Sequence, residues 1–497
     1  MSEDAFTDIS KFERQRREKL QKLRQWKIDP YGGRFENAVP AETVKAGYTD
    51  GQEGQRARCA GRIVLLRDIG KLIFVTLRDS SGTIQLGFSK QLMAQQWDFL
   101  KLLDLGDIIG AEGQLGKTKT GEITIWTDSV TLLSKALLPP PEKFHGLADP
   151  DLRYRMRYVD LWANPEVMKR FKTRSAIIAS IRQFLNERGF LEVETPMMQA
   201  QAGGAAARPF ITHHNSLNLD LYLRIAPELF LKRLLVGGME KVFEINRNFR
   251  NEGLSTRHNP EFTMMELYEA YADYRVMMDL SEELISRLIE THVGSWKLPF
   301  GSMEIDYSRP WRRARYADLL AEHAGCRIDD MPSVRAKARQ LGIPETNMDD
   351  AVVINAVFEE TVESHLINPT FVMDYPAAIC PLTKQSKADP RYAERFELFI
   401  GTMELANAYT ELNDPDVQER NFRMQLRGLS EEESMAKMDE DFIQALKYGM
   451  PPAGGLGIGI DRLIMLLTNA TSIRDVVLFP LLKPLAVKTA DTAENTD

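Results

Sequence analysis

The chain has 497 residues, enough for two to four domains and a sizeable hydrophobic core. Its 63 basic and 71 acidic side chains give a net charge of −8, so any contact with nucleic acid must come from local basic patches. The three cysteines, Cys59, Cys326 and Cys380, lie far apart without a paired or metal-binding spacing, which argues against a disulfide framework or a zinc site.

The first residues, 1–10, are acidic and polar, which is not the pattern of a signal peptide. No apolar run reaches the roughly 18 residues that a transmembrane helix needs. Together with the cysteine usage, these features predict a cytoplasmic protein that makes no contact with a membrane.

Residues 11–27 show helical spacing, with a thin apolar stripe formed by Phe12, Leu20, Leu23 and Trp26. Eight lysines and arginines stand there against two glutamates, a net charge of 8 − 2 = +6. Such a run is often only the solvated face of a helix. The alternative is a landing site for phosphates, which the acidity of the rest of the chain favours. We define residues 1–55 as this basic helix and an extension.

Residues 56–138 contain five strand-like runs, with a helical stretch over 91–104 between the third and the fourth. The stretch Asp79–Gly82 predicts a hairpin turn. Five strands with a helix after the third is the order of an OB-fold, whose sheet face and loops commonly bind oligonucleotides. Other small β-barrels have similar patterns, so the order of elements alone does not decide between them.

A proline-rich stretch begins a predicted linker or hinge over 139–164, and a larger region follows over 165–486. A helix over 165–188, capped by Gly189, opens this region. The strand-like runs beyond it lack regular βαβ alternation. We therefore expect an α+β fold with a mainly antiparallel sheet flanked by helices, rather than a doubly wound parallel sheet. The polar tail over 487–497 is expected to be disordered.

The predicted strand after residue 261 has an unusual face. Alternation places Thr263, Met265 and Leu267 on a core face, and it places four other side chains on the opposite face: Phe262, Met264, Glu266 and Tyr268. A buried carboxylate is costly unless it is paired. Glu266 should therefore have a cationic partner, which is either a structural lysine or arginine or a ligand.

The loop before this strand is rich in cations: Arg247, Arg250, Arg257 and His258. Arginine grips phosphate oxygens in pairs, so the loop suits a polyphosphate, and Phe262 just beyond it could lie under a base. A solvated charged turn is the plainer interpretation, and spacing alone leaves it open.

A second strand pair is expected over 396–412. If Gly401 and Thr402 form a two-residue turn, Glu397 opposes Ala406 and Glu404 opposes Phe399. The two carboxylates then project from the same side, as a shared Mg²⁺ would need.

Three further polar side chains of this strand, Asn407, Tyr409 and Glu411, have the opposite parity to the two glutamates. If all serve one pocket, the strand must contain a bulge or turn near 405–406.

The stretch AGGLGIGIDRLIMLL, residues 453–467, is a weak nucleotide fingerprint, because no βαβ unit follows it. It is better interpreted as a glycine-rich strand that lets something approach its backbone, followed by a buried helix. Arg462 falls in the first turn of that helix, where the macrodipole disfavours a cation, which hints at a phosphate-facing role.

In these stretches the sequence resembles the class II lysyl-tRNA synthetases of the bacterial and eukaryotic type, subclass IIb. GFLEVETPMM with Pro196 resembles motif 1, which forms the dimer interface in that family. FRNEGLSTRHNPEF resembles motif 2 and GGLGIGIDR motif 3. The stretches ARPFITHHN, LRIAPELFLKRLLVGG and ELANAYTELND resemble the lysine-specific segments. The resemblance covers roughly residues 10–483.

The resemblance implies four groups of site residues. Those that would bind ATP, with Arg250, Arg462 and Glu252 as the catalytic group, are Arg250, Glu252, His258, Asn259, Phe262, Glu397, Glu404 and Arg462. Those that would bind lysine are Gly204, Glu228, Arg250, Glu266, Tyr268, Asn407, Tyr409 and Glu411. Glu397 and Glu404 would hold Mg²⁺. Those that would read the anticodon are Arg67, Phe74, Gln85 and Glu122.

The implied function is ATP-dependent attachment of L-lysine to tRNA(Lys) through a lysyl-adenylate, carried out by a homodimer with Mg²⁺. Two alternatives stay open: lysylation of a protein acceptor, and a non-catalytic nucleic-acid-binding relative. The family match gives no role to Arg247 and Arg257. Met403, Ala406 and Ala408 depart from the charged residue and glycines of many bacterial relatives.

Overall fold

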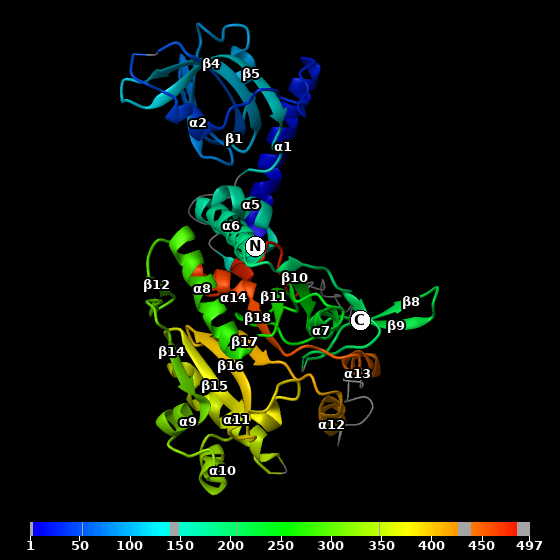
Figure 1. Ribbon diagram of the computed structural model, residues 1–497. Helices are drawn as coiled ribbons and strands as arrows, with labels where there is room; N and C mark the ends of the chain where they lie inside the picture. Colours follow the sequence, from blue (N-terminus) through cyan, green and yellow to red (C-terminus); the bar gives the residue numbers. More distant parts are fainter. Residues whose placement is uncertain are drawn as a thin grey trace, which may run out of the picture. The chain divides into compact units, whose positions relative to one another are not determined.

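The computed structural model describes residues 3–51, 53–139, 149–205, 207–346, 348–425 and 439–484. The chain divides into two compact units, Met1–Asp149 and Pro150–Asp497 (Figure 1). In the part of the chain that is described, no helix is long and apolar enough to cross a membrane.

The first unit is a closed five-stranded barrel with strand order β1-β2-β3-β5-β4. Its elements are α1 (Glu3–Gln25), α2 (Ala41–Ala46), β1 (Arg56–Ile69), β2 (Leu72–Arg78), β3 (Thr83–Ser89), α3 (Trp97–Leu100), β4 (Ile108–Lys117) and β5 (Ile123–Ser134). Arg78 pairs with Thr83, so the predicted turn at Asp79–Gly82 joins β2 to β3. The barrel and the short helix after its third strand confirm the predicted OB-fold.

One of the basic side chains of helix α1 forms hydrogen bonds inside the first unit. Arg16 is buried and donates to the backbone carbonyls of Leu105, Ala136 and Leu138. Leu20 and Leu23 are buried, as the predicted stripe requires. The stripe is shorter than predicted, because Phe12 is 44% exposed and Trp26, which lies beyond the end of the helix, is 48% exposed.

The second unit opens with helices where a linker was predicted. Helices α4 (Pro150–Arg155) and α5 (Arg157–Ala163) precede α6 (Pro165–Glu187). Arg157 is fully buried, pairs with Asp160 at 2.7 Å and donates to the backbone carbonyls of Arg474 and Leu478. These bonds reach more than 300 residues along the chain, which is why local sequence did not reveal that this segment is folded. Residues 140–148 of the predicted linker, and the predicted tail, lie outside the described residues.

An eight-stranded sheet with order β14-β15-β16-β17-β18-β11-β10-β6 is the centre of the second unit. The strands are β6 (Leu191–Glu192), β10 (Lys241–Phe249), β11 (Glu261–Ala270), β14 (Arg312–Arg315), β15 (Thr370–Pro376), β16 (Tyr392–Ile400), β17 (Met403–Thr410) and β18 (Ala453–Gly459). Only the two outermost pairs, β14–β15 and β10–β6, are parallel. The mainly antiparallel sheet was predicted, and its edge strand β6 is only two residues long.

Three helices cover one face of this sheet: α6, α8 (Tyr274–His292) and α14 (Ile460–Leu467) (Figure 1). They share one hydrophobic core with Met265 and Leu267 of β11, which confirms the predicted core face of that strand. Gly189 has φ +79°, as the predicted cap after α6 requires. The polar side chains of β11 therefore belong to the opposite face.

The remaining elements surround the sheet. Small sheets form from β7 (Met198–Gln199), β8 (Ile211–His214) and β9 (Leu219–Leu223), and from β12 (Lys297–Phe300) and β13 (Met303–Asp306). Between β14 and β15 the chain forms α9 (Tyr316–Ala324), α10 (Met331–Gln340), α11 (Asp350–Thr361) and the 3₁₀ turn η1 (Glu363–His365). The others are α7 (Glu228–Val236), η2 (Ala377–Ile379), α12 (Pro415–Gln425), α13 (Glu440–Leu446) and η3 (Ile473–Asp475).

Candidate active site

The register of the large sheet aligns polar residues from five strands. Directly opposed residues share a face. One row across the sheet therefore runs through Glu397, Asn407, Gly457, Glu266 and Glu244. The row beside it runs through Arg395, Tyr409, Gly455, Tyr268 and Val242.

A bulge in β17 brings the two predicted groups of side chains together. Glu404 opposes Phe399 as predicted, but Glu397 opposes Asn407, and its predicted pairing with Ala406 is wrong. The register shifts there because Leu405 is an extra residue without a partner on β16. The predicted bulge at 405–406 is thus confirmed, and it turns Glu404 and Asn407 to one face.

Glycines of β18 make room on this face. A Cβ atom on Gly455 would stand 2.0 Å from Glu411 Oε1 and 2.5 Å from Tyr268 Cε1. A Cβ atom on Gly457 would stand 2.8 Å from the flexible end of Met264. The predicted glycine-rich strand followed by a buried helix is confirmed, because α14 begins directly after Gly459. Side chains from both neighbouring strands occupy the space that the missing Cβ atoms leave.

Glu266 is a buried carboxylate without a cation. It is 5% exposed, and its one hydrogen bond comes from the Tyr268 hydroxyl at 3.2 Å. Within the described residues no lysine or arginine forms an ion pair with it, so the structural salt bridge that was one alternative is wrong. Burial, followed by the negative charge of Glu228, raises the pKa of Glu266 to about 8. An ammonium ligand would supply the missing charge.

Glu228 and Glu411 share a buried lysine of the protein. Lys232 Nζ lies 2.6 Å from Glu228 Oε1 and 2.5 Å from Glu411 Oε2. Oε1 of Glu411 is buried without a hydrogen-bond partner among the described residues. Gly204 lies beside Glu228, since a Cβ atom on it would stand 3.2 Å from the Glu228 Cβ. The predicted lysine-binding residues from three separate parts of the chain therefore meet here.

An adjoining cavity gathers most of the predicted ATP residues. Its lining includes Arg250, Glu252, His258, Asn259, Phe262, Glu404, Asn407 and Arg462. Arg250 lies over the Phe262 ring at 5.2 Å, and its Nε is buried without a hydrogen-bond partner in the described part of the chain. Glu397 and the lysine-pocket residues Glu228, Glu266, Tyr268 and Glu411 are not part of this lining.

His258 and Arg462 face each other across the cavity. Arg462 lies in the first turn of α14, as predicted, and donates to the Glu404 carbonyl at 2.5 Å. Its Nη2 stands 3.2 Å from His258 Nε2, and Ser255 contacts the other ring nitrogen at 2.9 Å. Burial, followed by the positive charge of Arg462, lowers the pKa of His258. The imidazole is therefore neutral at pH 7, so Nε2 can accept a hydrogen bond from Arg462 while Nδ1 donates one to Ser255.

The carboxylates predicted to hold Mg²⁺ lie in an acidic surrounding. Glu397 accepts from the Tyr375 hydroxyl at 2.7 Å and pairs with Arg395. Burial, opposed by Arg395 and then supported by the charge of Glu404, raises the pKa of Glu397. Burial with the nearby carboxylates raises the pKa of Glu363 to about 7. Among the described residues no set of three or more histidines, cysteines and acids forms a metal site, so phosphate oxygens would have to complete the coordination.

Arg247 and Arg257, whose roles were left open, make structural contacts. Arg257 donates to the backbone carbonyl and hydroxyl of Thr402, at 3.0 and 3.1 Å, and so joins the motif 2 loop to the β16–β17 turn. Arg247 pairs with Glu261 across β10 and β11 at 3.6 Å. Thr402 has φ +61°, which agrees with the predicted tight turn.

The sequence interpretation missed three pocket residues. Asn246 opposes Met264 and Asn248 opposes Phe262, so both lie on the pocket face, where several of their amide atoms are buried without a hydrogen-bond partner within the described residues. The polar alternation of Glu244, Asn246 and Asn248 was a signal that could have identified them. The spacing of Glu228 and Lys232 was a local signal for Lys232, but its second partner, Glu411, is 179 residues away.

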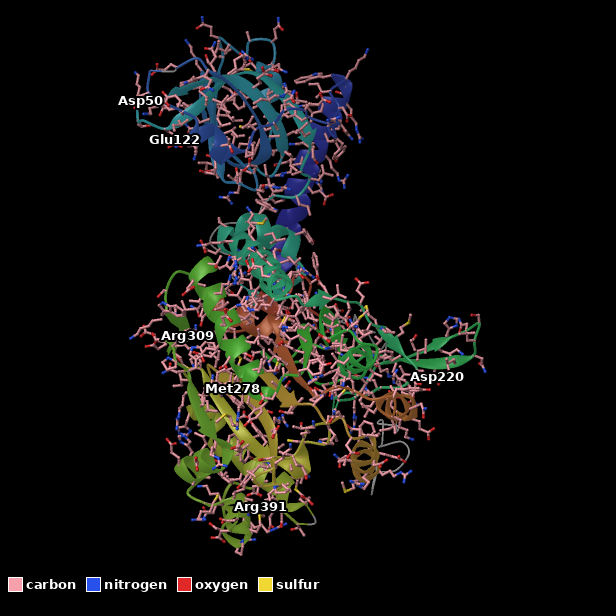
Figure 2. All side chains as sticks on the ribbon, in the orientation of Figure 1. Asp50, Glu122, Asp220, Met278, Arg309 and Arg391 are labelled. Carbon is pink, nitrogen blue, oxygen red and sulfur yellow. The ribbon has the colours of Figure 1, made fainter. Side chains whose placement is uncertain are left out.

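On the barrel, three of the predicted anticodon residues lie together. Arg67 opposes Phe74 and donates to Gln85 at 3.2 Å. Phe74 packs edge-on against Trp126, with ring centroids 6.0 Å apart, and Gly87 between their strands leaves the rings uncovered. Trp126 was not predicted, although its place in an alternating strand was visible. Glu122, labelled in Figure 2, is exposed on the turn before β5.

Comparison with known proteins agrees with this geometry. Residues 149–483 match the family of class II tRNA synthetases (D, K and N), and residues 57–133 match the OB-fold nucleic acid binding domain. A protein named lysine–tRNA ligase from Carboxydothermus hydrogenoformans is 52% identical over 96% of this chain and 99% of its own length. One of the same name from Pelotomaculum thermopropionicum is 53% identical over 96% of each chain. The chain belongs to the class II tRNA synthetases of the D, K and N group.

Proposed function

We propose that this protein attaches L-lysine to tRNA(Lys) in an ATP-dependent reaction. The observation that carries the proposal is Glu266, a buried carboxylate with a phenol beside it and no ion-pair partner among the described residues. A pocket for aspartate or asparagine would gain nothing from that charge, whereas an ε-ammonium group would neutralise it. The relatives named above as lysine–tRNA ligases support the same substrate.

In the first step, a carboxylate oxygen of lysine attacks the α-phosphorus of ATP. A new P–O bond forms, the bond to the β-phosphate breaks, and lysyl-adenylate and pyrophosphate result. Such chemistry depends on positioning and on stabilising negative charge. Arg250 has an unsatisfied buried Nε in the cavity and would bind the carboxylate and α-phosphate, while Arg462 would bind the phosphates from the other side.

The remaining cavity residues would hold the nucleotide. Phe262 presents an aromatic ring beneath Arg250, which suits a stacked adenine. Asn259 has a buried side-chain oxygen without a hydrogen-bond partner among the described residues. It would accept a hydrogen bond from the ligand. His258 is neutral and already contacts Arg462, and Glu252 completes the ATP-facing side.

Glu397 and Glu404 would hold Mg²⁺. They fit this role because Glu404 adds to the electrostatic repulsion that raises the pKa of Glu397, and a divalent cation beside them would remove that repulsion. When bound, the ion neutralises phosphate charge. The chain itself fixes Glu397 through Tyr375 and Arg395, and Glu404 through the bulge at Leu405.

In the second step, the 3′-hydroxyl of the terminal ribose takes the lysyl group and AMP leaves. The barrel face with Arg67, Phe74, Gln85 and Trp126 would hold unpaired anticodon bases by stacking and hydrogen bonding. A family match over this whole barrel favours a tRNA acceptor over a protein acceptor.

Two further features belong to this proposal. Pro196 lies among exposed apolar side chains, with Leu191 53%, Met197 44% and Met198 56% exposed, as a homodimer interface would require. The three cysteines are free and buried, which suits the reducing cytoplasm.

ATP–pyrophosphate exchange with each of the standard amino acids, followed by charging of purified tRNAs, tests the proposed function. We expect exchange with lysine and charging of tRNA(Lys). Exchange that depends on another amino acid would contradict the substrate assignment. Lysine-dependent exchange without tRNA charging would favour a protein acceptor.

A further inference from the structure

Lys232 has no part in the proposed chemistry, yet its ammonium group contacts two residues of the proposed lysine pocket. It lies on α7, is fully buried, and its ammonium group bridges Glu228 and Glu411 at 2.6 and 2.5 Å. Burial alone would lower the pKa of Lys232, but the two carboxylates outweigh that effect and raise it. Lys232 is therefore a permanent positive charge beneath the pocket.

The buried charges of the pocket can be counted. With all three carboxylates ionised, the state that bound ammonium groups favour, Glu228, Glu266 and Glu411 contribute −3 and Lys232 contributes +1, which leaves −2. The phenols of Tyr268 from β11 and Tyr409 from β17 also face them, and burial raises the pKa of both, so they stay neutral. Glu244 and Arg250 act on Glu266 as well, but Glu244 is paired with Arg224 at 2.6 Å. Free lysine brings two ammonium groups. The carboxylate of free lysine is left out of this count, because its negative charge would be neutralised by Arg250.

We propose that Lys232 is a positioning residue that matches the charge of this pocket to the two ammonium groups of its amino-acid substrate. Its ammonium group bridges Glu228 and Glu411 and favours the ionised form of Glu411. This inference rests on the proposed lysine-dependent function and assigns a role to a residue that does not touch the reacting atoms.

A purely structural role explains the arrangement less well. Glu228 and Lys232 are four residues apart on one helix, and an exposed pair of this kind stabilises a helix only slightly. A buried pair costs desolvation, and apolar residues of the same size commonly give equal or greater stability. Oε1 of Glu411 lies against the Gly455 backbone and is buried without a hydrogen-bond partner among the described residues, so the cluster is not satisfied by its own members.

Lys232→Met, with the apolar length kept and the charge removed, is the main test. In pyrophosphate exchange at pH 7 we expect the KM for lysine to rise at least about tenfold, with the KM for ATP unchanged within about twofold. Removing the ammonium group also removes what lowers the pKa of Glu411, which burial already raises to about 7. The ratio of variant to wild-type KM for lysine should therefore fall as the pH rises from 6.5 to 8.5.

Two control variants separate charge from structure. Arg233→Met, the next residue on α7, removes ion pairs with Asp439 and Asp441 outside the pocket and should leave the KM for lysine unchanged. Lys232→Arg keeps the positive charge and should remove the pH dependence of the KM ratio, even if the larger side chain weakens binding.

A double variant gives a sharper test and also serves if Lys232→Met alone fails to fold. Glu411→Gln alone leaves a pocket charge of −1 against two ammonium groups, whereas Lys232→Met with Glu411→Gln restores −2. The double variant should therefore have a lower KM for lysine than Glu411→Gln alone, which is a non-additive effect.

A double variant with a KM for lysine equal to or above that of Glu411→Gln would overturn the inference. A KM ratio for Lys232→Met that does not change with pH would do the same. Wild-type exchange with lysine is measured first, so a failure of the proposed function would be visible there, before any variant is compared.

Discussion

The acidic pocket of the second unit and the open face of the barrel recognise their proposed ligands by opposite physical means. In the pocket, Glu266, Glu411 and Lys232 are buried, and their charges act without water between them. On the barrel, Phe74 and Trp126 are half-buried rings that contact each other, and a hydrogen bond from Arg67 to Gln85 lies on the same face. Buried charge rejects a ligand that lacks the matching charge, whereas stacking tolerates many bases. Changes in the pocket should therefore be severe and specific to lysine, and changes on the barrel moderate and specific to tRNA.

The largest effect is expected for Glu266→Gln. The amide keeps the shape of the side chain but cannot neutralise an ammonium group, so kcat/KM for lysine in pyrophosphate exchange should fall at least about 10³-fold. The KM for ATP should stay within about threefold, because Glu266 is not part of the nucleotide cavity. Equal losses for lysine and ATP would mean that Glu266 is a structural residue.

Gly455→Ala should have the next largest effect. The new methyl group would stand 2.0 Å from Glu411 Oε1, so we expect kcat/KM for lysine to fall about 10²-fold. Gly459→Ala is the matched control on the same strand, because a Cβ atom there would stand at an ordinary contact distance of 3.6 Å from its nearest neighbour, the Leu405 carbonyl oxygen. If both variants lose the same activity, space beside Glu411 is not what these glycines provide.

Phe74→Ala should have a moderate effect that is confined to the second step. Loss of one stacked base should raise the KM for tRNA about tenfold in charging assays, while lysine-dependent pyrophosphate exchange stays normal. The same pattern is expected for Trp126→Ala. Unchanged charging by both variants would remove this face of the barrel from the anticodon site.

The smallest effect concerns stability without substrate. The pKa of Glu266 is about 8 in the folded protein against an ordinary value of 4.5, so the folded state holds a proton that the unfolded state releases between these values. The stability that comes from burying the neutral acid is thus present below pH 4.5 and lost as the pH rises to about 8. Relative to wild type, Glu266→Gln should gain about 2 °C or more in Tm between pH 5 and pH 8.

Glu261→Gln is the control for that measurement, because Glu261 is an exposed carboxylate on the same strand. It should show no such trend in Tm. A difference between Glu266→Gln and wild type that stays constant with pH would show that Glu266 is ionised in the free protein.

Much of the site could be predicted from the sequence, because alternation along a strand is a local property. It placed Glu266 on a face opposite to Met265 and Leu267, and parity predicted a bulge or turn near 405–406 if both groups of side chains serve one pocket. Interactions between distant segments could not be predicted. The pairing of Glu397 with Asn407 depends on which residue bulges, and the charge on Glu411 is balanced by Lys232 from another part of the chain. The folding of 150–163 depends on carbonyl groups near the end of the second unit for the same reason.

The most direct test of the account compares lysine with norleucine, which has nearly the same shape but no ε-ammonium group, in wild-type pyrophosphate exchange. A pocket that selects by a buried, unpaired carboxylate should prefer lysine by about 10⁴-fold or more in kcat/KM. A preference of only about 10- to 200-fold, which shape and apolar contact alone can provide, would contradict the central role of Glu266.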